Sequence, residues 1–188
     1  MTALGGDVQL MEMLGGDGLV AARHLHFYGY TPTIYYPKQS QNELYQRLCK
    51  QLRDLNVPFT DDFHSAASST SLIVDAVFGF SFSGEVREPF PAVIKAFEEA
   101  KVPVLSVDAP SSWNIETGPP EDGPGKSFMP DALISLTAAK PLVKWYKGRH
   151  FIGGRFLSKA IAEKYGIEAP SYQGIDQIVE VPVGEGKL

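Results

Sequence analysis

Ser71-Leu72-Ile73-Val74-Asp75-Ala76-Val77-Phe78, residues 71–78, is a nearly continuous apolar run with one carboxylate inside it. A run of this kind is typical of a β-strand buried on both faces, as in a parallel sheet covered by helices. Two more apolar runs follow, at residues 102–107 and 132–136. The sequence therefore predicts three strands of the type that parallel sheets use.

Stretches with helical spacing alternate with these strands. Apolar residues recur at helical spacing in residues 18–28, 42–55, 90–97 and 157–165, and residues 31–36 form another predicted strand. Alternating strands and helices favour an α/β fold whose mostly parallel sheet has helices on both faces. Folds of this class bind ligands beyond the carboxyl ends of the strands, so the search for a site narrows to those ends.

The composition describes a globular chain without strong charge. Its 188 residues fit one domain spanning residues 1–188, 44% of them are hydrophobic, and the formal net charge is −5. An acidic chain offers no basic surface to phosphate backbones, so we expect no nucleic-acid partner. No apolar stretch approaches the ~20 residues that cross a bilayer, and the N-terminus lacks a signal-peptide pattern. Because Cys49 is the only cysteine, the sequence indicates a reducing, intracellular compartment.

Polar residues follow the ends of the predicted strands. Asp75 lies inside the first run, Asp108 and Ser111 follow the second, and Lys140 follows the third. A buried carboxylate is costly unless it is paired, so two of them at one sheet edge could share a cation or an acid–base task. Each Asp alone is better explained as a cap for its own loop through backbone amides. The two together with Ser111 favour a site.

Two glycine-containing segments are candidates for nucleotide contact. Gly15-Gly16-Asp17-Gly18 precedes the first predicted helix, and residues 79–85 leave the strand that carries Asp75. Glycines let a ligand approach the backbone, and helix N-terminal amides attract phosphate. The alternatives are an ordinary turn with an N-cap for the first segment and an ordinary strand-to-helix connection for the second.

Several classes of enzyme are disfavoured by missing motifs. The sequence has no G-x-G-x-x-G, which argues against an ordinary nicotinamide dehydrogenase. Its histidines have no cysteine or carboxylate at zinc-ligand spacing, and no serine sits in a nucleophile-elbow pattern. We therefore expect neither zinc chemistry nor a serine hydrolase.

These segments, in this order, resemble the signatures of one family. The resemblance is carried by residues 15–25, 74–82, 107–113, 133–140 and 153–156, which are similar to the dinucleotide loop and first helix, the central strand and substrate loop, and three later motifs of the NAD(P)H-hydrate epimerases. In animals this family is also known as apolipoprotein A-I-binding protein. The similarity covers nearly everything from Gly15 to the C-terminus.

The resemblance implies a fold and a reaction. The fold would be a three-layer α-β-α Rossmann-like domain, and the reaction would interconvert the R and S forms of hydrated NADH and NADPH (NADHX and NADPHX) at C6. A partner dehydratase would then restore the cofactor. One potassium ion per subunit and a homodimer are further expectations. We expect the protein in the cytoplasm, with the mitochondrion as a second compartment.

The resemblance also implies roles for individual residues. Asp75 and Ser111 match the family's potassium ligands, and oxygen ligands suit a hard cation. Asp108 is the first candidate for proton transfer at the C6 hydroxyl, and Lys140 is the second, for placing or neutralising charge. The substrate-binding positions are Gly15, Gly16, Asp17, Gly79, Phe80, Ser81, Phe82, Ser83, Gly84, Glu85 and Asp108.

The front of the chain departs from the family pattern. Met13 and Leu14 stand where the family has two asparagines, and leucine offers no oxygen to an ion. Residues 9–12 resemble a piece of the N-terminal helix, while the next helix and an internal strand are predicted to be missing. Ser112 replaces a glycine beside the ion site, where its side chain could crowd the turn. The alternative function is a catalytically impaired member that binds nucleotides or proteins.

Overall fold

The structure is a computed structural model that describes residues 7–12, 16–167 and 170–183. Its strands are β1 (Asp7–Glu12), β2 (Thr31–Tyr35), β3 (Phe59–Thr60), β4 (Leu72–Ala76), β5 (Val104–Val107), β6 (Ala132–Leu136), β7 (Arg149–Gly153) and β8 (Ile178–Val181). Its helices are α1 (Asp17–Phe27), α2 (Glu43–Asp54), α3 (Phe63–Ser68), α4 (Phe90–Glu98), α5 (Lys159–Tyr165) and the 3₁₀ helix η1 (Pro141–Trp145).

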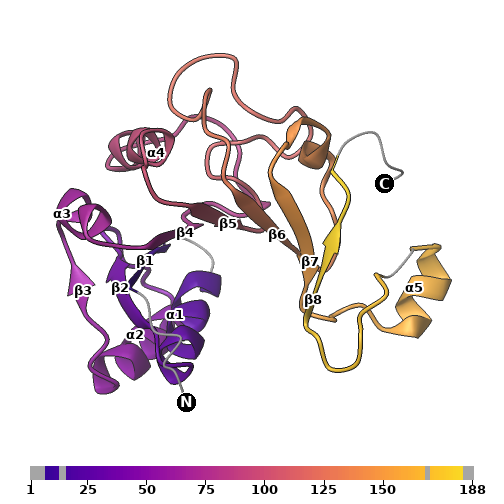
Figure 1. The fold of residues 1–188 in the computed structure, drawn as a ribbon, viewed down its shortest axis with the longest axis horizontal. Coiled ribbons are helices and arrows are strands. Elements are labelled where there is room, and N and C mark those ends of the chain that lie inside the picture. The colour runs from indigo at the N-terminus through magenta and orange to yellow at the C-terminus, as the bar shows by residue number, and fades with distance from the viewer. Residues whose placement is uncertain (1–6, 13–15, 168–169, 184–188) are drawn as a thin grey trace.

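One sheet organises these elements. The strand order is β3-β2-β1-β4-β5-β6-β7-β8, and every neighbouring pair is parallel except β7 and β8. The chain builds outward from β1 to β3, returns to place β4 on the other side of β1, and then continues to β8 (Figure 1). The topology therefore switches direction between β1 and β4, which is where open α/β sheets bind their ligands.

Helices cover both faces of the sheet. Helices α1 and α2 lie on one face, and α3 and α4 lie on the other (Figure 1). Neighbouring residues of β4 show the alternation, because Val74 packs in the cluster with α1 and α2 while Ile73 packs in the cluster with α3 and α4. The predicted three-layer α/β architecture with a mostly parallel sheet is confirmed.

The helices follow from local signals that the sequence carries. The Asn42 side chain accepts a hydrogen bond from the Leu44 amide and caps α2, whose apolar stripe buries Cys49 and Leu52. Gly166, with φ of 63°, ends α5 in the left-handed conformation. The first predicted helix corresponds to α1, and the helix predicted over residues 90–97 corresponds to α4.

The prediction of a missing internal strand is wrong. Residues 7–12 form β1, which pairs in parallel with β2 on one side and β4 on the other. Residues 9–12 are therefore strand rather than a piece of helix, because the two neighbouring strands offer hydrogen-bonding edges that only an extended segment can fill. Met13, Leu14 and Gly15 lie outside the described residues.

The described helices include none with the length and apolar character needed to cross a membrane. A third apolar cluster lies under η1 and contains Trp113, Leu133, Leu142 and Tyr146. It supports the loops that follow β5 and β6, and these loops carry the candidate site.

Candidate functional site

The candidate site lies at the carboxyl edge of the sheet. The ends of β4, β5 and β6 and the start of α1 meet there, beside the switch in topology (Figure 1). Of the predicted site residues, Asp75, Asp108, Ser111 and Lys140 all come together at this edge through contacts described below.

Asp75 is fully buried at the centre of this edge. Its Oδ1 accepts hydrogen bonds from the Ser111 hydroxyl at 2.5 Å and from the Val77 amide at 3.3 Å. Its Oδ2 accepts from the Ser106 hydroxyl at 2.7 Å and from the Ser111 amide at 2.9 Å. Burial raises the pKa of Asp75, and these hydrogen bonds oppose that rise. The carboxyl group therefore ties β4 to β5 and to the loop after it.

Asp108 and Lys140 form the second polar pair of the site. The Lys140 ammonium group donates to Asp108 Oδ1 and, at 2.8 Å, to the carbonyl oxygen of Leu136. Asp108 Oδ2 accepts from the Phe80 amide at 2.9 Å. Only 8% of the Asp108 side chain and 16% of the Lys140 side chain are exposed, so water screens this pair poorly. The pair presents one fixed negative and one fixed positive charge to the crevice.

The residues that directly follow β5 and β6 both have an uncommon backbone conformation. Asp108 directly follows β5 with φ of 71°, and Thr137 directly follows β6 with φ of 72°. In each case the next amide donates to the carbonyl two residues back, at 2.9 Å, which closes a γ-turn around the residue. Non-glycine residues rarely adopt this conformation, and such strain concentrates at functional sites. The turn aims Asp108 at Lys140.

Asp17 at the start of α1 adds a third carboxyl group to the site, after Asp75 and Asp108. Burial raises the pKa of Asp17, the negative charge of Asp108 raises it further, and the Lys140 ammonium opposes this. The charges of Asp108 and Lys140 therefore act on Asp17 across the crevice. Gly16 caps α1 with φ of 81°. The site thus holds a carboxylate paired with a lysine and, beside them, a carboxyl group whose pKa is raised, an arrangement suited to proton transfer.

The loop of residues 79–85 contacts Asp108 at its start. The amide of Phe80 binds Asp108, and a β-carbon at Gly79 would lie 3.5 Å from Asp108 Oδ2. Phe82 stacks on Phe78 with ring centroids 4.4 Å apart. The later predicted residues, Ser81, Ser83, Gly84 and Glu85, are exposed, and Ser83 and Gly84 line a cavity together with Ser112. The structure therefore joins Gly79 and Phe80 to the predicted catalytic pair.

Ser112 occupies the turn that the sequence predicts to be crowded. Its φ is 80°, and its buried hydroxyl has no hydrogen-bond partner among the described residues. Gly125 makes room for it, because a β-carbon at Gly125 would lie 1.6 Å from the Ser112 hydroxyl oxygen. The serine is accommodated by a neighbouring glycine rather than by a shift of the turn.

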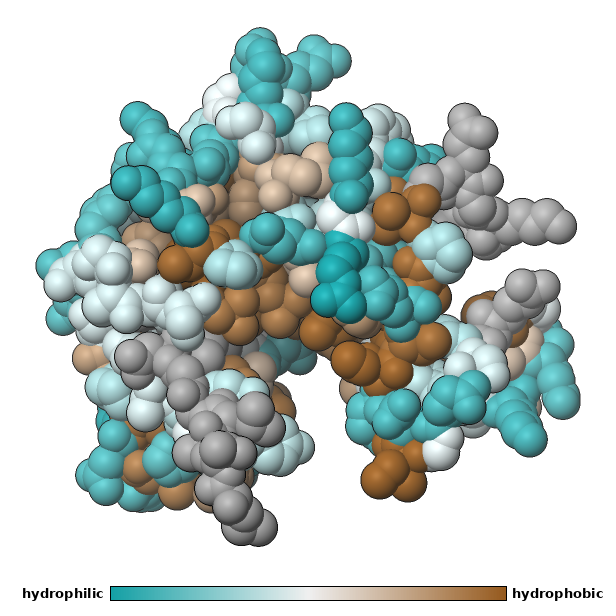
Figure 2. Space-filling view, in the orientation of Figure 1, coloured by the Kyte–Doolittle hydropathy of each residue, from teal (hydrophilic) through white to brown (hydrophobic). Residues whose placement is uncertain are grey.

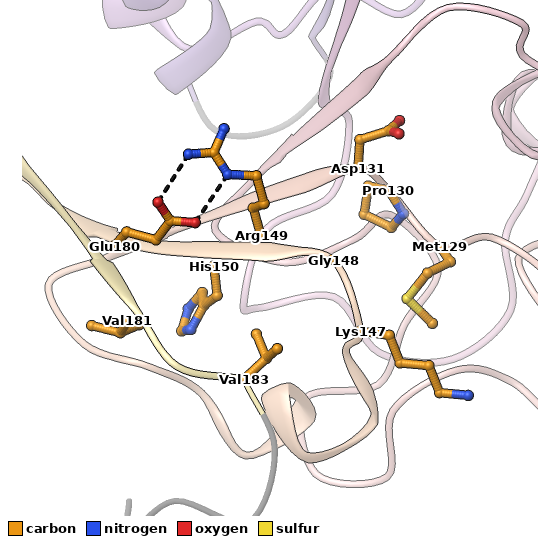
Figure 3. A pocket seen from close by; sticks show the side chains of 10 residues that line it. All are labelled: Met129, Pro130, Asp131, Lys147, Gly148, Arg149, His150, Glu180, Val181 and Val183. Atoms are coloured by element: carbon orange, nitrogen blue, oxygen red, sulfur yellow. Dashed lines mark hydrogen bonds and ion pairs between the residues drawn. The ribbon is translucent and has the colours of Figure 1, made fainter.

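A cavity of about 500 Å³ elsewhere on the sheet is distinct from this site. Met129, Asp131, Gly148 and Arg149 line it, and these residues precede or begin β6 and β7, at the amino edge (Figure 3). Arg149 makes a bidentate ion pair with Glu180, which also lines the cavity, with two nitrogen–oxygen distances of 2.9 Å. This pair joins β7 to β8.

Two contacts of the site were not predicted from the sequence. Ser106 donates to Asp75 from within β5, and the Leu136 carbonyl holds Lys140. The signal for Ser106 is its position two residues before Asp108 in an apolar strand, where a polar side chain on the buried face needs a partner. A backbone carbonyl has no sequence signal at all.

The described residues contain no group of three or more histidine, cysteine or acidic side chains that could hold a metal ion. The Asp75–Ser111 pair nevertheless has the chemistry of a site for a monovalent cation. Its donors are all oxygen, and the ion pairs of the described residues leave the buried Asp75 carboxylate without a cationic partner. Because hydrogen bonds occupy all four acceptor positions of Asp75, a cation bound there would replace the hydrogen bond that the Ser111 hydroxyl donates to Oδ1.

The fold and this edge define a class of protein: a three-layer α/β domain with an acid–lysine pair and a buried oxygen site at a topological switch point. Residues 11–142 match the family model described as YjeF-related protein N-terminus. The chain belongs to this family.

Curated relatives and a solved structure agree with this assignment. An NAD(P)H-hydrate epimerase from Phaeosphaeria nodorum is 72% identical over 174 residues, which are 93% of this chain and 73% of the relative. One from Schizosaccharomyces pombe is 56% identical over 172 residues, covering 89% and 71%. The crystal structure of the yeast protein YNL200c superposes with a TM-score of 0.87 at 36% identity, covering 94% of this chain and 78% of that one.

Proposed function

We propose that this chain is an NAD(P)H-hydrate epimerase, an isomerase of nicotinamide nucleotide repair. It interconverts the R and S forms of NADHX and NADPHX. The observation that carries the proposal is the Asp108–Lys140 pair at the carboxyl edge of the sheet, in a chain 72% identical to an enzyme of that name. Gly15, Gly16, Asp17 and the loop of residues 79–85 are the proposed substrate contacts, as the resemblance implies.

Asp108 is the proposed base. It takes the proton of the C6 hydroxyl, the C6–N1 bond breaks with its electron pair moving to N1, and C6 becomes a carbonyl. Rotation exposes the other face of the carbonyl, N1 attacks it, and the proton returns to the oxygen. Nothing is gained or lost overall, so the step needs no oxidant or reductant. Asp108 is suited to the role because Lys140 and the Phe80 amide hold both its oxygens.

Lys140 and Asp17 support the same step. The Lys140 ammonium stabilises negative charge that develops on the C6 oxygen, as preorganised charges do at other active sites. Burial raises the pKa of Asp17, and Asp17 is the proposed donor of a hydrogen bond or a proton toward N1. The proposal thus assigns the base to Asp108 and the acid to Asp17.

A potassium ion is part of the proposal. Asp75 and Ser111 would hold it, and its fixed positive charge would help orient an anionic nucleotide. We expect the unfolding temperature to be higher in potassium chloride than in choline chloride at equal ionic strength. The reason is that an ion that binds only the native state stabilises that state. The difference should vanish in Ser111→Ala. An equal unfolding temperature in both salts would contradict the potassium site while leaving the epimerase proposal intact.

Turnover tests the function. R-NADHX is offered to the purified chain, and a dehydratase specific for the S form reports conversion. We expect conversion that falls about 10²–10⁴-fold in Asp108→Ala, the range that a general base contributes. A folded chain without conversion would contradict the proposal and leave the alternative of a nucleotide-binding module. Lys95→Gln on α4, far from the site and 69% exposed, serves as the control.

The remaining proposals concern the partner enzyme, the oligomeric state and the compartment of the chain. The dehydratase that consumes the S form is the proposed functional partner, and the chain is proposed to act as a homodimer formed through its exposed apolar surface. The proposed compartments are the cytoplasm and the mitochondrion, which fractionation with a tagged chain would test.

A further inference from the structure

A second cavity adjoins the site on the side of β2. It has a volume of about 420 Å³, within the range of small-ligand pockets. Two segments line it: the loop after β2, with Lys38, and residues 78–90, with Phe82 and Arg87. Phe82 belongs to the loop already proposed to contact the substrate, whereas Lys38 and Arg87 have no role in the proposed reaction and residues 38–41 carry no predicted role.

The floor and rim of this cavity differ in chemistry. Phe78 and Phe90 are buried beneath it and touch edge to face, with ring centroids 5.5 Å apart, and the half-buried Phe82 stacks on Phe78. Lys38 and Arg87 are exposed on the rim, together with Glu85 and Glu88. An aromatic floor suits a flat base, and a rim with cations and carboxylates suits a sugar phosphate.

The rim charges are available to a ligand. The ion pairs that the described residues form do not include Lys38, Arg87, Glu85 or Glu88. Carboxylates of this kind accept hydrogen bonds from ribose hydroxyls, and guanidinium or ammonium groups accommodate a ribose phosphate.

The loop that carries Lys38 is held in place. The Ser40 amide donates to the Tyr36 hydroxyl oxygen at 3.1 Å, and the Asn42 amide donates to the Ser40 hydroxyl oxygen at 3.1 Å. Arg53 donates to the side-chain oxygen of Gln39 at 3.3 Å. The loop is therefore anchored on both sides of Lys38, which lowers the entropy lost on binding.

The cavity lies where the far end of a dinucleotide would reach. From β5, which carries Asp108, the sheet order passes through β4 and β1 to β2. Three strand spacings amount to roughly 14 Å across the edge. In dinucleotide-binding α/β folds the end of the second strand reads the 2′ position of the adenosine ribose, and Lys38 is placed after β2.

We propose that this cavity binds the adenosine end of the substrate, with the base on Phe82, and that Lys38 and Arg87 recognise the 2′-phosphate of the phosphorylated form. The inference rests on the proposed function for the identity of the substrate. It predicts that the chain distinguishes the phosphorylated nucleotide from the unphosphorylated one, and that two exposed cations are responsible.

Binding of two fragments by calorimetry tests the inference without turnover. We expect adenosine 2′,5′-bisphosphate to bind the full chain about tenfold more tightly than 5′-AMP, a factor that corresponds to about 1.4 kcal/mol. The preference should disappear in the double variant Lys38→Gln/Arg87→Gln and persist in the control Lys95→Gln. Phe82→Leu should weaken both fragments by the same factor, because it changes the base contact only.

Kinetics with the two substrates give the second readout. In the double variant we expect the KM of NADPHX to rise relative to that of NADHX by about tenfold, with the ratio of the two kcat values unchanged. Equal affinity of the wild-type chain for both fragments, or a preference that survives in the double variant, would overturn the inference. If the chain binds the fragments as expected but shows no conversion, the epimerase proposal fails and the 2′-phosphate site stands.

Discussion

Gly16 shows how one residue fixes the start of the site. It caps α1 with φ of 81°, and a β-carbon there would lie 2.8 Å from the ring of Tyr45. Glycine is required twice, because L side chains are strained in this conformation and because α2 approaches closely. Gly29, which follows α1 with φ of 87°, has open space around it.

Gly16→Ala and Gly29→Ala should therefore differ. We expect Gly29→Ala to lower the free energy of unfolding by about 1–2 kcal/mol, the cost of a left-handed L residue. Gly16→Ala should lower the free energy of unfolding by about 1–3 kcal/mol more, because its β-carbon would also overpack against Tyr45. Urea unfolding measures both, and equal losses would show that Tyr45 moves away at no cost.

His150 is a buried base outside the catalytic pair. It is 1% exposed in β7, its Nε2 lies 2.9 Å from the Ser135 hydroxyl, and its Nδ1 has no hydrogen-bond partner among the described residues. Burial, with the charge of Lys140 as a second cause, lowers the pKa of His150 to about 4. The native state therefore holds this imidazole neutral.

The stability of the chain should fall in mild acid because of His150. Above the ordinary histidine pKa of about 6.5 the imidazole is neutral in both the folded and the unfolded state, so its titration does not change the free energy of unfolding. As the pH falls from 6.5 toward 4, only the unfolded state takes up the proton, so the free energy of unfolding decreases by up to about 3 kcal/mol. Urea unfolding between pH 7 and 4.5 measures this slope. His150→Gln should flatten it, and an unchanged slope in that variant would assign the loss to carboxyl groups.

Site residues divide into those with a sequence signal and those without. Asp75, Asp108 and Ser111 were predictable because polar residues stand out at the ends of apolar strands. The influence of Asp108 and Lys140 on Asp17 was not, since it depends on how the start of α1 lies relative to the residues that follow β5 and β6. Lys38 and Arg87 look like any exposed cations until two loops, separated by almost fifty residues in the chain, form one cavity.

At the scale of elements, periodicity predicted those with long, regular patterns. The apolar stripe of α2 and the continuous runs of β4 and β6 were sufficient. The six residues of α3 and the four of β8 are too short to show a period. The sequence pattern does not predict β7, because residues 149–153 begin with arginine and histidine. The burial of this strand becomes evident only from its pairing with β6.

β1 is the clearest case of neighbours deciding an element. Its sequence, Asp-Val-Gln-Leu-Met-Glu, can be read as a helix or as a strand. The edges of β2 and β4 decide in favour of the strand, since both would otherwise carry unpaired backbone groups inside the sheet.

Proline substitutions test whether β1 is an internal strand. Leu10→Pro removes a backbone donor between β2 and β4, and we expect it to lower the free energy of unfolding by about 3 kcal/mol or to prevent folding. Val179→Pro in β8, which pairs only with β7 in the described sheet, should cost less than half as much. Equal losses would mean that β1 does not hold the centre of the sheet.

At the scale of the whole molecule, one side of the surface is unusually apolar. Apolar side chains gather in the hollow between the layer of α1 and α2 and the segment of α5 (Figure 2). The seven-residue helix α5 has no buried residue, and Phe156, Ile161 and Tyr165 are 65%, 46% and 65% exposed. A short helix without a packed face gains little stability alone. Exposed apolar groups of this extent are typical of contact surfaces.

Association should therefore depend on the α5 segment. We expect sedimentation velocity to show a dimer at micromolar concentration. Replacement of Phe156, Ile161 and Tyr165 by serine should shift the chain to monomer without lowering its unfolding temperature. Ile175→Ser, at a side chain 90% exposed in the loop before β8, is the matched control. A monomeric wild-type chain would contradict the homodimer.

Phe78 belongs to two places at once: its amide donates to the Ser111 hydroxyl at 3.0 Å, and its ring forms part of the floor beneath the adenosine cavity. A potassium ion that reorients the Ser111 hydroxyl and an adenine base that contacts the floor of the cavity would therefore both act on Phe78. Cooperativity between two ligands is reciprocal, because the coupling free energy belongs to the pair. If potassium tightens nucleotide binding by some factor, the nucleotide must tighten potassium binding by that same factor. The potassium concentration in the cell would then change the affinity for the nucleotide, and the nucleotide concentration would change the affinity for potassium, through Phe78.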